Sequence, residues 1–245
     1  MNAPAPAPLP LVLWDLDGTL VRLDVPRAAV DGWRARLGAV FRPFGYGGPW
    51  APLLPCLERA LAAAAGVRGA PAAAEVYAAL DAWEAEALGG VEVLEGTAGA
   101  WQALGARGVP QAVVTNNGPT AAGRALDALR AWAAARGRGW VEPVAVVTRG
   151  PGLAAKPAAD ALERACDRAA AAGWPGCGVV VAGDRDDDAG AAAALQARRA
   201  RPVVFVRARA GRLDVEPAAA ALGALGLEPA WLPSESAGST PPEAG

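Results

Sequence analysis

The 245-residue chain contains no histidine. This absence excludes Ser-His-Asp triads, Cys-His pairs and zinc sites with histidine ligands. Serine is almost as scarce, because its only occurrences are Ser234, Ser236 and Ser239, close to the end of the chain. A serine nucleophile in a folded site is therefore not expected. Any chemistry must come from carboxylates, threonine hydroxyls, lysine, arginine, backbone groups or bound metal.

Cysteine is also rare, and Cys56, Cys166 and Cys177 show neither a metal-ligand spacing nor a CxxC pair. The first residues, MNAPAPAPLP, have no basic region and no long apolar run of the kind found in secretory signals. An odd number of cysteines without such a signal predicts reduced thiols in the cytoplasm. No apolar run is long enough to predict a membrane span, so we expect no membrane partner.

Basic charge is limited, and it is almost entirely arginine, since Lys156 is the only lysine among 23 basic residues. The net charge of −2 and the isoelectric point near 5.3 give no global basic field. Nucleic acid is therefore not expected as a partner. The hydrophobic fraction of 53% comes largely from alanine-rich runs, which are typical of helices.

Strands and helices alternate over the second half of the chain. The expected strands are 9–15, 109–117, 143–148, 177–184 and 202–208, and the expected helices between them are 121–137, 157–173 and 189–200. Strands that are apolar throughout and separated by helices predict a parallel sheet covered on both faces. The predicted fold class is α/β, with a Rossmann-like parallel sheet core.

The segment between the first two expected strands has helical periodicity, and its Gly- and Pro-rich stretch 42–50 predicts a loop. We expect no strand between 24 and 90. The predicted organisation is a core of 9–22 and 92–232, interrupted by a helical insert at 23–91. The ends, 1–8 and 233–245, have the composition of disordered segments.

Two acids follow the first expected strand in WDLDGTL. Functional groups of parallel α/β sheets gather at the carboxyl ends of the strands. Asp15 at the strand tip is a candidate nucleophile or metal ligand, and Asp17 can lean over the same pocket. Gly18 permits the tight reversal that follows.

Polar residues also follow the second and fourth core strands. Thr115 in VVTNN offers a hydroxyl beside backbone amides that enter a helix, which is a natural phosphate cradle, and Asn116 is a further candidate there. Asp184 could join Asp15 in binding a hard cation through oxygen, the preference of Mg²⁺. Asp188 is the expected second acid of this motif.

Asp187 is the alternative to Asp188, because the run DRDDD blurs the assignment. The acidic run also suits a helix start, where negative charge is favoured. Lys156 follows the third core strand. Its compact ammonium fits between carboxylates and a phosphate where a planar guanidinium would not, although a solvated charge is the simpler interpretation.

These elements, in this order, resemble the haloacid dehalogenase-like superfamily over about 9–22 and 92–210. The insert resembles the helical cap of its phosphoglycolate phosphatase-like members. The residues that carry the resemblance are Asp15 and Asp17 in DLDGTL, Thr115 in VVTNN, Lys156 in AKPAAD, and Asp184 and Asp188 in GDRDDDAGAA.

The resemblance implies a Mg²⁺-dependent phosphatase acting on a small phosphorylated metabolite, phosphoglycolate-like or a sugar phosphate. Asp15 would form an aspartyl-phosphate, and Asp17 would act as acid and base. Metal would be held by Asp15, Asp184 and the backbone carbonyl of Asp17. Phosphate would be held by Thr115, Asn116 and Lys156, with Asp188 orienting Lys156 or a metal-bound water.

Departures from the family pattern narrow this expectation. The acid at Asp17 disfavours dehalogenation, and a cap with neither lysine nor histidine disfavours the phosphonoacetaldehyde hydrolase and β-phosphoglucomutase branches. Phosphoryl transfer to another acceptor and a non-catalytic phosphate- or metal-binding protein remain alternatives, as do monomer and homodimer. Candidate specificity residues are Arg22, Arg42 and Tyr46, whereas Phe44 and Trp50 are expected to pack inside the cap.

Overall fold

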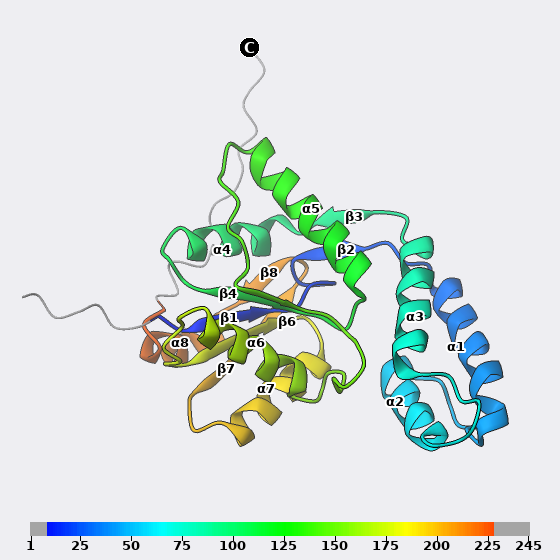
Figure 1. Cartoon of the computed structure of the whole chain (residues 1–245). Helices are drawn as coiled ribbons and strands as arrows, with labels where there is room; N and C mark the ends of the chain where they lie inside the picture. The colour runs from blue at the N-terminus through cyan, green and yellow to red at the C-terminus, as the bar shows by residue number, and fades with distance from the viewer. Residues whose placement is uncertain (1–8, 228–245) are drawn as a thin grey trace, which may run out of the picture.

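The computed structural model describes residues 9–227 and contains one six-stranded sheet in the order β5-β4-β1-β6-β7-β8 (Figure 1). Its strands are β1 (Leu11–Trp14), β4 (Gln111–Val114), β5 (Ala145–Val147), β6 (Val179–Gly183), β7 (Val203–Arg209) and β8 (Arg212–Asp214). The first five run parallel, and β8 pairs antiparallel with β7. The predicted parallel α/β sheet is confirmed. The predicted arm at 1–8 and tail at 233–245 lie outside the described residues.

Both faces of the sheet are covered, as the apolar strands predict. The helices of the core are α4 (Glu95–Gly105), α5 (Pro119–Ala135), α6 (Asp160–Ala171), α7 (Asp186–Arg198) and α8 (Ala219–Ala224), with a short 3₁₀ turn η2 (Glu216–Ala218). Side chains alternate between faces along each strand. Val12 and Trp14 therefore pack against α4, α5 and α8. Leu11 and Leu13 pack against α6 and α7.

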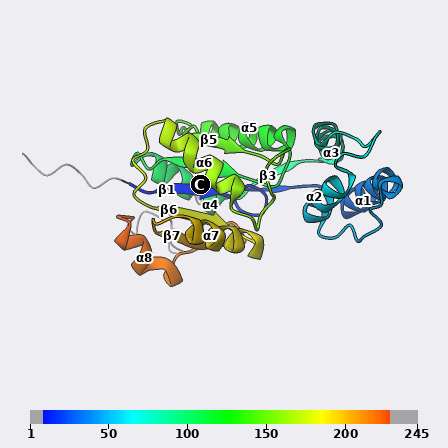
Figure 2. The ribbon, with the colours of Figure 1, turned by 60° about the horizontal axis from the view of Figure 1, so that its bottom comes forward.

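The insert consists of helices, as expected, and forms a cap with its own hydrophobic core. Its elements are α1 (Arg27–Phe41), the 3₁₀ turn η1 (Arg42–Phe44), α2 (Leu53–Ala64) and α3 (Ala73–Ala87). Trp33, Phe41, Leu57 and Leu80 are buried among these helices. Figure 2 shows the cap helices grouped at one end of the molecule, beyond the sheet and its covering helices.

Two connections join the cap to the core, and they pair as a second small sheet. β2 (Val21–Leu23) runs antiparallel to β3 (Val91–Val93). Neither strand is expected from the sequence, because three residues are too few to show a periodicity of two. The same reason accounts for β8, which follows β7 after a turn at Ala210 and Gly211.

Two helix starts differ from those expected. α6 begins at Asp160, three residues after the expected 157. α7 begins at Asp186, three residues before the expected 189, because the acids at 186–188 form its first turn. Negative charge is favourable at that end of a helix.

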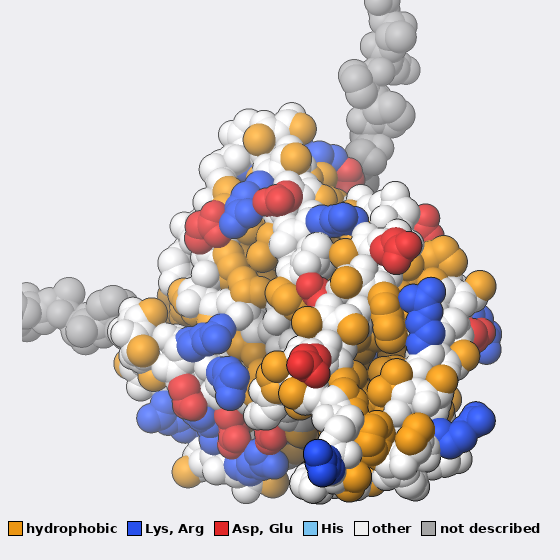
Figure 3. Space-filling view, turned by 45° about the vertical axis from the view of Figure 1, so that its right-hand side comes forward, with side chains coloured by type: hydrophobic (Ala, Val, Ile, Leu, Met, Phe, Trp, Pro, Cys, Tyr) orange, Lys and Arg blue, Asp and Glu red, His pale blue; other side chains and the backbone are white. Residues whose placement is uncertain are grey.

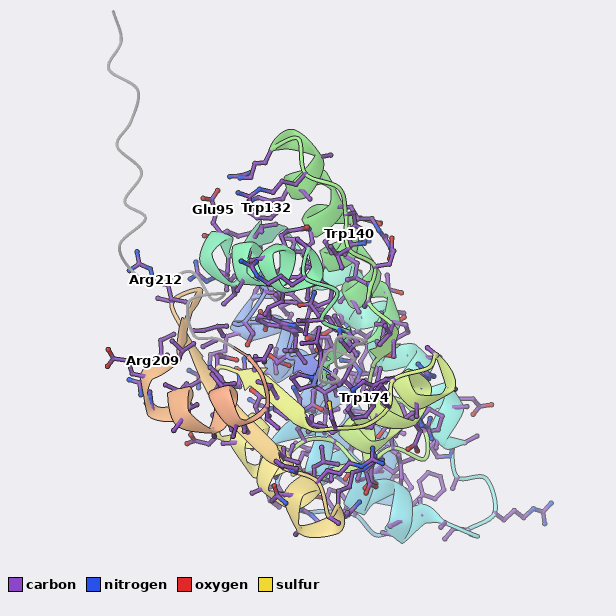
Figure 4. All side chains as sticks on the ribbon, turned by 90° about the vertical axis from the view of Figure 1, so that its left-hand side faces the viewer. Glu95, Trp132, Trp140, Trp174, Arg209 and Arg212 are labelled. Carbon is purple, nitrogen blue, oxygen red and sulfur yellow. The ribbon has the colours of Figure 1, made fainter. Side chains whose placement is uncertain are left out.

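Tryptophans fill much of the core on the side of α4 and α5. The Trp14 and Trp101 rings lie 6.0 Å apart, and Trp140 stacks on Trp101 at 5.8 Å. Figure 4, viewed from the side away from the cap, shows Trp140 and Trp132 in this region, and the Arg136 guanidinium lies 4.6 Å from the Trp132 ring. The tryptophan at 101 thus packs in the core, as its helical spacing predicts.

The surface does not gather charge of one sign on the face shown in Figure 3, where acidic and basic side chains of the described residues are interspersed among apolar ones. Within 9–227, none of the helices combines the length and the apolar character that crossing a membrane requires.

The cap core gives a stability prediction. Leu57 is fully buried on α2, whereas Leu61, one turn later, is half-buried. Leu57→Ala should lower the free energy of unfolding by about 2–5 kcal/mol, because it removes buried methyl groups and leaves a cavity. Leu61→Ala should cost clearly less. Urea unfolding of both variants measures this, and equal losses would contradict the packing described here.

Candidate active site

The cavity that brings the sequence-predicted residues together lies between the cap and the carboxyl ends of the core strands. Its volume is about 170 Å³. The core contributes Asp15, Asp17, Asn116, Lys156, Asp187 and Asp188 to its lining, and the cap contributes Leu53, Leu54 and Glu84. The cavity is therefore closed by residues from both parts of the chain.

Lys156 is the centre of this arrangement, with a side chain only 4% exposed. Its ammonium donates to Asp15 Oδ1, to Asp188 Oδ1 and, at 3.1 Å, to the carbonyl oxygen of Val114. All three of its protons thus have acceptors. Burial alone would lower the pKa of Lys156, but the carboxylates of Asp15 and Asp188 outweigh it and raise the pKa. The ammonium therefore carries its charge inside the protein.

Asp15 continues the line of β1, and its backbone amide donates to Ala182 O at 2.8 Å. Burial raises the pKa of Asp15 to about 6; Lys156 lowers it in part, and the acids Asp188 and Asp184 raise it further. Near neutral pH the carboxylate is ionised, which is the form that a nucleophile or a metal ligand needs.

Three carboxylates form a candidate cation site. Oxygens of Asp15, Asp184 and Asp188 lie within 4.8 Å of one another. Within the described residues, Asp184 Oδ1 is buried and has no hydrogen-bond partner, so this oxygen can serve as a ligand for a cation. Burial raises the pKa of Asp184. An all-oxygen donor set fits a hard divalent ion.

Asp188 contributes less to such a site than the other two acids. Its Oδ1 accepts from Lys156, and its Oδ2 accepts from the backbone amide of Arg185 at 3.1 Å. Asp187 is exposed and makes no such contact with Lys156. The structure therefore assigns the expected contact with Lys156 to Asp188.

Position 18 must be glycine because the side chain of Asp184 lies close to it. Its φ is +87°, a conformation that residues with a Cβ rarely adopt. A Cβ at this position would lie 2.3 Å from Asp184 Oδ2. The turn after β1 can therefore pass this close to Asp184, which itself does not line the cavity, only with glycine here.

Asp17 lies on the cavity wall, separate from the carboxylate cluster. Its Oδ1 accepts the backbone amide of Leu23 at 2.9 Å, and its Oδ2 lies 3.8 Å from the exposed Arg185 guanidinium. Burial is the main cause that raises its pKa. A raised pKa increases the protonated fraction, which suits an acid that also acts as a base.

The loop after β4 differs in part from expectation. Thr115 is buried, its hydroxyl donates to Asn117 Oδ1 at 2.7 Å, and it does not line the cavity. Asn116 does line it, and its Oδ1 accepts the backbone amide of Lys156 at 3.2 Å. The hydroxyl expected to face a phosphate thus stabilises its own loop, because Asn117 also donates to it.

The three candidate specificity residues do not reach the cavity. Arg22 pairs with Glu92 across β2 and β3 at 2.7 Å. Arg42 is exposed in η1. The Tyr46 hydroxyl donates to Pro49 O at 3.1 Å, and its ring lies edge-on to Trp50 at 5.1 Å. Glu92 thus holds Arg22, and contacts inside the cap hold Tyr46, away from the pocket.

Phe44 and Trp50 pack against the cap core, as expected.

Three charged residues that line the cavity are not expected from the sequence: Glu84, Arg149 and the exposed Arg185. Glu84 is buried at 3% exposure on α3, and Arg149 follows β5 with a side chain 7% exposed. Glu84 lies four residues after Leu80 on the buried face of the helix. An acid within this apolar stripe is the sequence pattern that could have indicated a functional Glu84. Arg149 follows a strand end, where functional side chains gather.

Comparisons with known proteins give one family match and several similar structures. A sequence model of the haloacid dehalogenase-like hydrolases matches residues 9–196. CbbY from Rhodobacter sphaeroides, solved with phosphate, has 19% identity and a TM-score of 0.45 over 82% of this chain and 88% of its own. A hydrolase from Pseudomonas syringae has 19% identity and a TM-score of 0.47 over 88% and 90%. No curated protein was found to match.

The pKa of Asp15 predicts a pH dependence of stability in chelator-treated protein. Well below pH 3.8 this carboxyl is protonated whether the chain is folded or unfolded. As pH rises to 6, the unfolded chain releases the proton at its ordinary pKa of 3.8 while the folded chain retains it, so stability falls. Asp15→Asn lacks this titration. Between pH 4 and 7 its stability relative to wild type should grow by about 2 kcal/mol.

Urea unfolding at several pH values in the presence of a chelator measures the difference between the two proteins. Other acids titrate in both, so their effects largely cancel. A difference that stays constant from pH 4 to 7 contradicts the raised pKa.

Proposed function

The chain belongs to the haloacid dehalogenase-like hydrolases, and from this premise we propose that it is a Mg²⁺-dependent phosphatase of the cytoplasm. Its proposed substrate is a small phosphomonoester, phosphoglycolate-like or a sugar phosphate. The small cavity supports a substrate of metabolite size. The observation that carries the proposal is Lys156, enclosed between Asp15 and Asp188 at the cavity wall.

In the proposed reaction, an ionised oxygen of Asp15 bonds to phosphorus as the bond to the leaving oxygen breaks. Asp17 gives its proton to that leaving oxygen. Asp17 then takes a proton from water, which attacks the aspartyl-phosphate and frees inorganic phosphate and Asp15. The raised pKa of Asp17 supports the first proton transfer, and the ionised Asp15 supports the attack.

The charged neighbours of Asp15 have separate proposed roles. Lys156 keeps Asp15 ionised and contributes positive charge beside the phosphoryl group, with Asn116 as its neighbour in phosphate binding. Asp188 orients Lys156. Asp15 and Asp184 would hold Mg²⁺, together with the backbone carbonyl of Asp17. When bound, the ion offsets negative charge on the phosphoryl oxygens.

The direct test is hydrolysis of a generic aryl phosphate with Mg²⁺. Wild type should turn it over, and Asp15→Asn should lose activity by at least about 10³-fold, because the nucleophile is gone. Asp186→Asn changes an exposed acid of the same run, which pairs with Arg207 and does not line the cavity; it serves as the control and should retain most activity. Full activity in Asp15→Asn would overturn the mechanism. Transfer to added alcohols without hydrolysis would indicate a phosphotransferase instead.

The single lysine gives a second test. Lys156→Arg should lower kcat nearly as much as Lys156→Ala, by about 100-fold, because a wider planar cation cannot occupy a buried position with three converging acceptors. Steady-state kinetics of the two variants, with circular dichroism to check folding, measures the effect. Near-normal turnover by Lys156→Arg contradicts the role given to the ammonium.

A further inference from the structure

Glu84 is a cap residue whose carboxylate is bound almost entirely by the core. Its Oε1 accepts from Asn117 Nδ2 at 2.9 Å, and its Oε2 accepts from the backbone amide of Gly118 at 2.8 Å. Arg149 Nη2 lies 3.0 Å from the same Oε2. The carboxylate therefore crosses from α3 to the loop that follows β4, at the start of α5.

Arg149 binds the same loop through its Nη1 and its backbone amide. Its Nη1 donates to Asn116 O at 3.2 Å, and its backbone amide donates to Asn117 O at 3.2 Å. Glu84 thus accepts hydrogen bonds from N–H groups of the loop, whereas Arg149 donates to its carbonyl oxygens. The two charged side chains, themselves an ion pair, fix both sides of the peptide units at 116–118.

This loop is tied in turn to Lys156. Asn116 Oδ1 accepts the Lys156 backbone amide at 3.2 Å, and Asn116 Nδ2 lies 3.5 Å from the Lys156 carbonyl oxygen. A second cap acid, Glu58, accepts the neighbouring amide of Ala155 at 2.6 Å. Two adjacent residues, Asn117 and Asn116, therefore link the Glu84 carboxylate to the Lys156 backbone.

The contacts of Glu84 exceed what docking of the cap needs. Asp81, one turn earlier on α3, already attaches the cap to α5 through the Thr120 amide and hydroxyl, at 3.1 and 2.7 Å. A buried ion pair adds little stability, because desolvation of both charges opposes their attraction. In the described residues, Arg149 Nε is buried without a hydrogen-bond partner, which is a further cost. A purely structural contact would not require this pair.

We propose that Glu84 is a positioning residue: by binding Asn117, Gly118 and Arg149, it holds the 115–118 loop, and through Asn116 the Lys156 backbone, in the geometry that receives the phosphoryl group. The phosphate-binding loop is then fully ordered only while Glu84 contacts it. This inference rests on the proposed function, since it concerns the same phosphate site.

The test compares Glu84→Gln with two variants on the same helix. Glu86→Gln changes an exposed acid two residues later. Asp81→Asn weakens docking at Thr120 without touching the 115–118 loop through a hydrogen bond. For each, kcat and KM on an aryl phosphate are measured, together with the inhibition constant of inorganic phosphate, the half-saturating Mg²⁺ concentration and the urea midpoint.

Glu84→Gln should raise the inhibition constant of phosphate and lower kcat/KM by about 10- to 100-fold, the range for residues that orient a binding group. Its half-saturating Mg²⁺ concentration should stay within about twofold of wild type, because the cation candidates Asp15 and Asp184 are untouched. Glu86→Gln and Asp81→Asn should keep phosphate inhibition within about twofold.

Unchanged phosphate inhibition in a folded Glu84→Gln overturns the inference, as does an equal loss in Asp81→Asn, which would reduce the effect to docking. If Glu84→Gln fails to fold, Asn117→Ala interrupts the same link from the core side, and unchanged inhibition there overturns it equally. Wild type that neither hydrolyses the aryl phosphate nor binds phosphate contradicts the proposed function itself, a result distinct from these.

Discussion

The site depends on the balance of charge around one buried ammonium. Lys156 lies between Asp15 and Asp188 at the meeting point of strands that are distant in sequence. Without this cation, the buried carboxylates of Asp15 and Asp188 would face each other and the nearby carboxylate of Asp184. Such groups would take up protons and lose the charge their chemistry needs. The parallel sheet matters for the site because it places these residues at one edge, the carboxyl ends of its strands.

The cap participates in the same electrostatic unit. It lines the cavity with the apolar side chains of Leu53 and Leu54, and it binds the loop beside Lys156 through Glu84. Apolar surroundings strengthen the charge interactions in the site. The cap therefore contributes apolar lining from α2 and a carboxylate that binds the core loop from α3. The position of the cap is thus linked to the order of that loop.

The sequence predicts the fold class and the strand-end residues well, because apolar strands and polar tips follow simple rules of sheet geometry. It does not predict β2, β3 or β8, which depend on tertiary pairing. It also misplaces the Thr115 hydroxyl and misses Glu84 and Arg149, because their partners lie on other elements. Local patterns reveal which residues stand at a strand end; the direction of each side chain depends on neighbours that the fold supplies.

Lys156 carries the only side-chain primary amine in the chain, and it is 4% exposed. In the folded protein, a reagent that acylates amines therefore has no accessible lysine: burial limits access to Lys156, and the two carboxylates that raise its pKa disfavour the nucleophilic free-base form. Reaction at this position requires the site to open. Because it is the only lysine, Lys156 is thus a chemical reporter of local opening at the cavity.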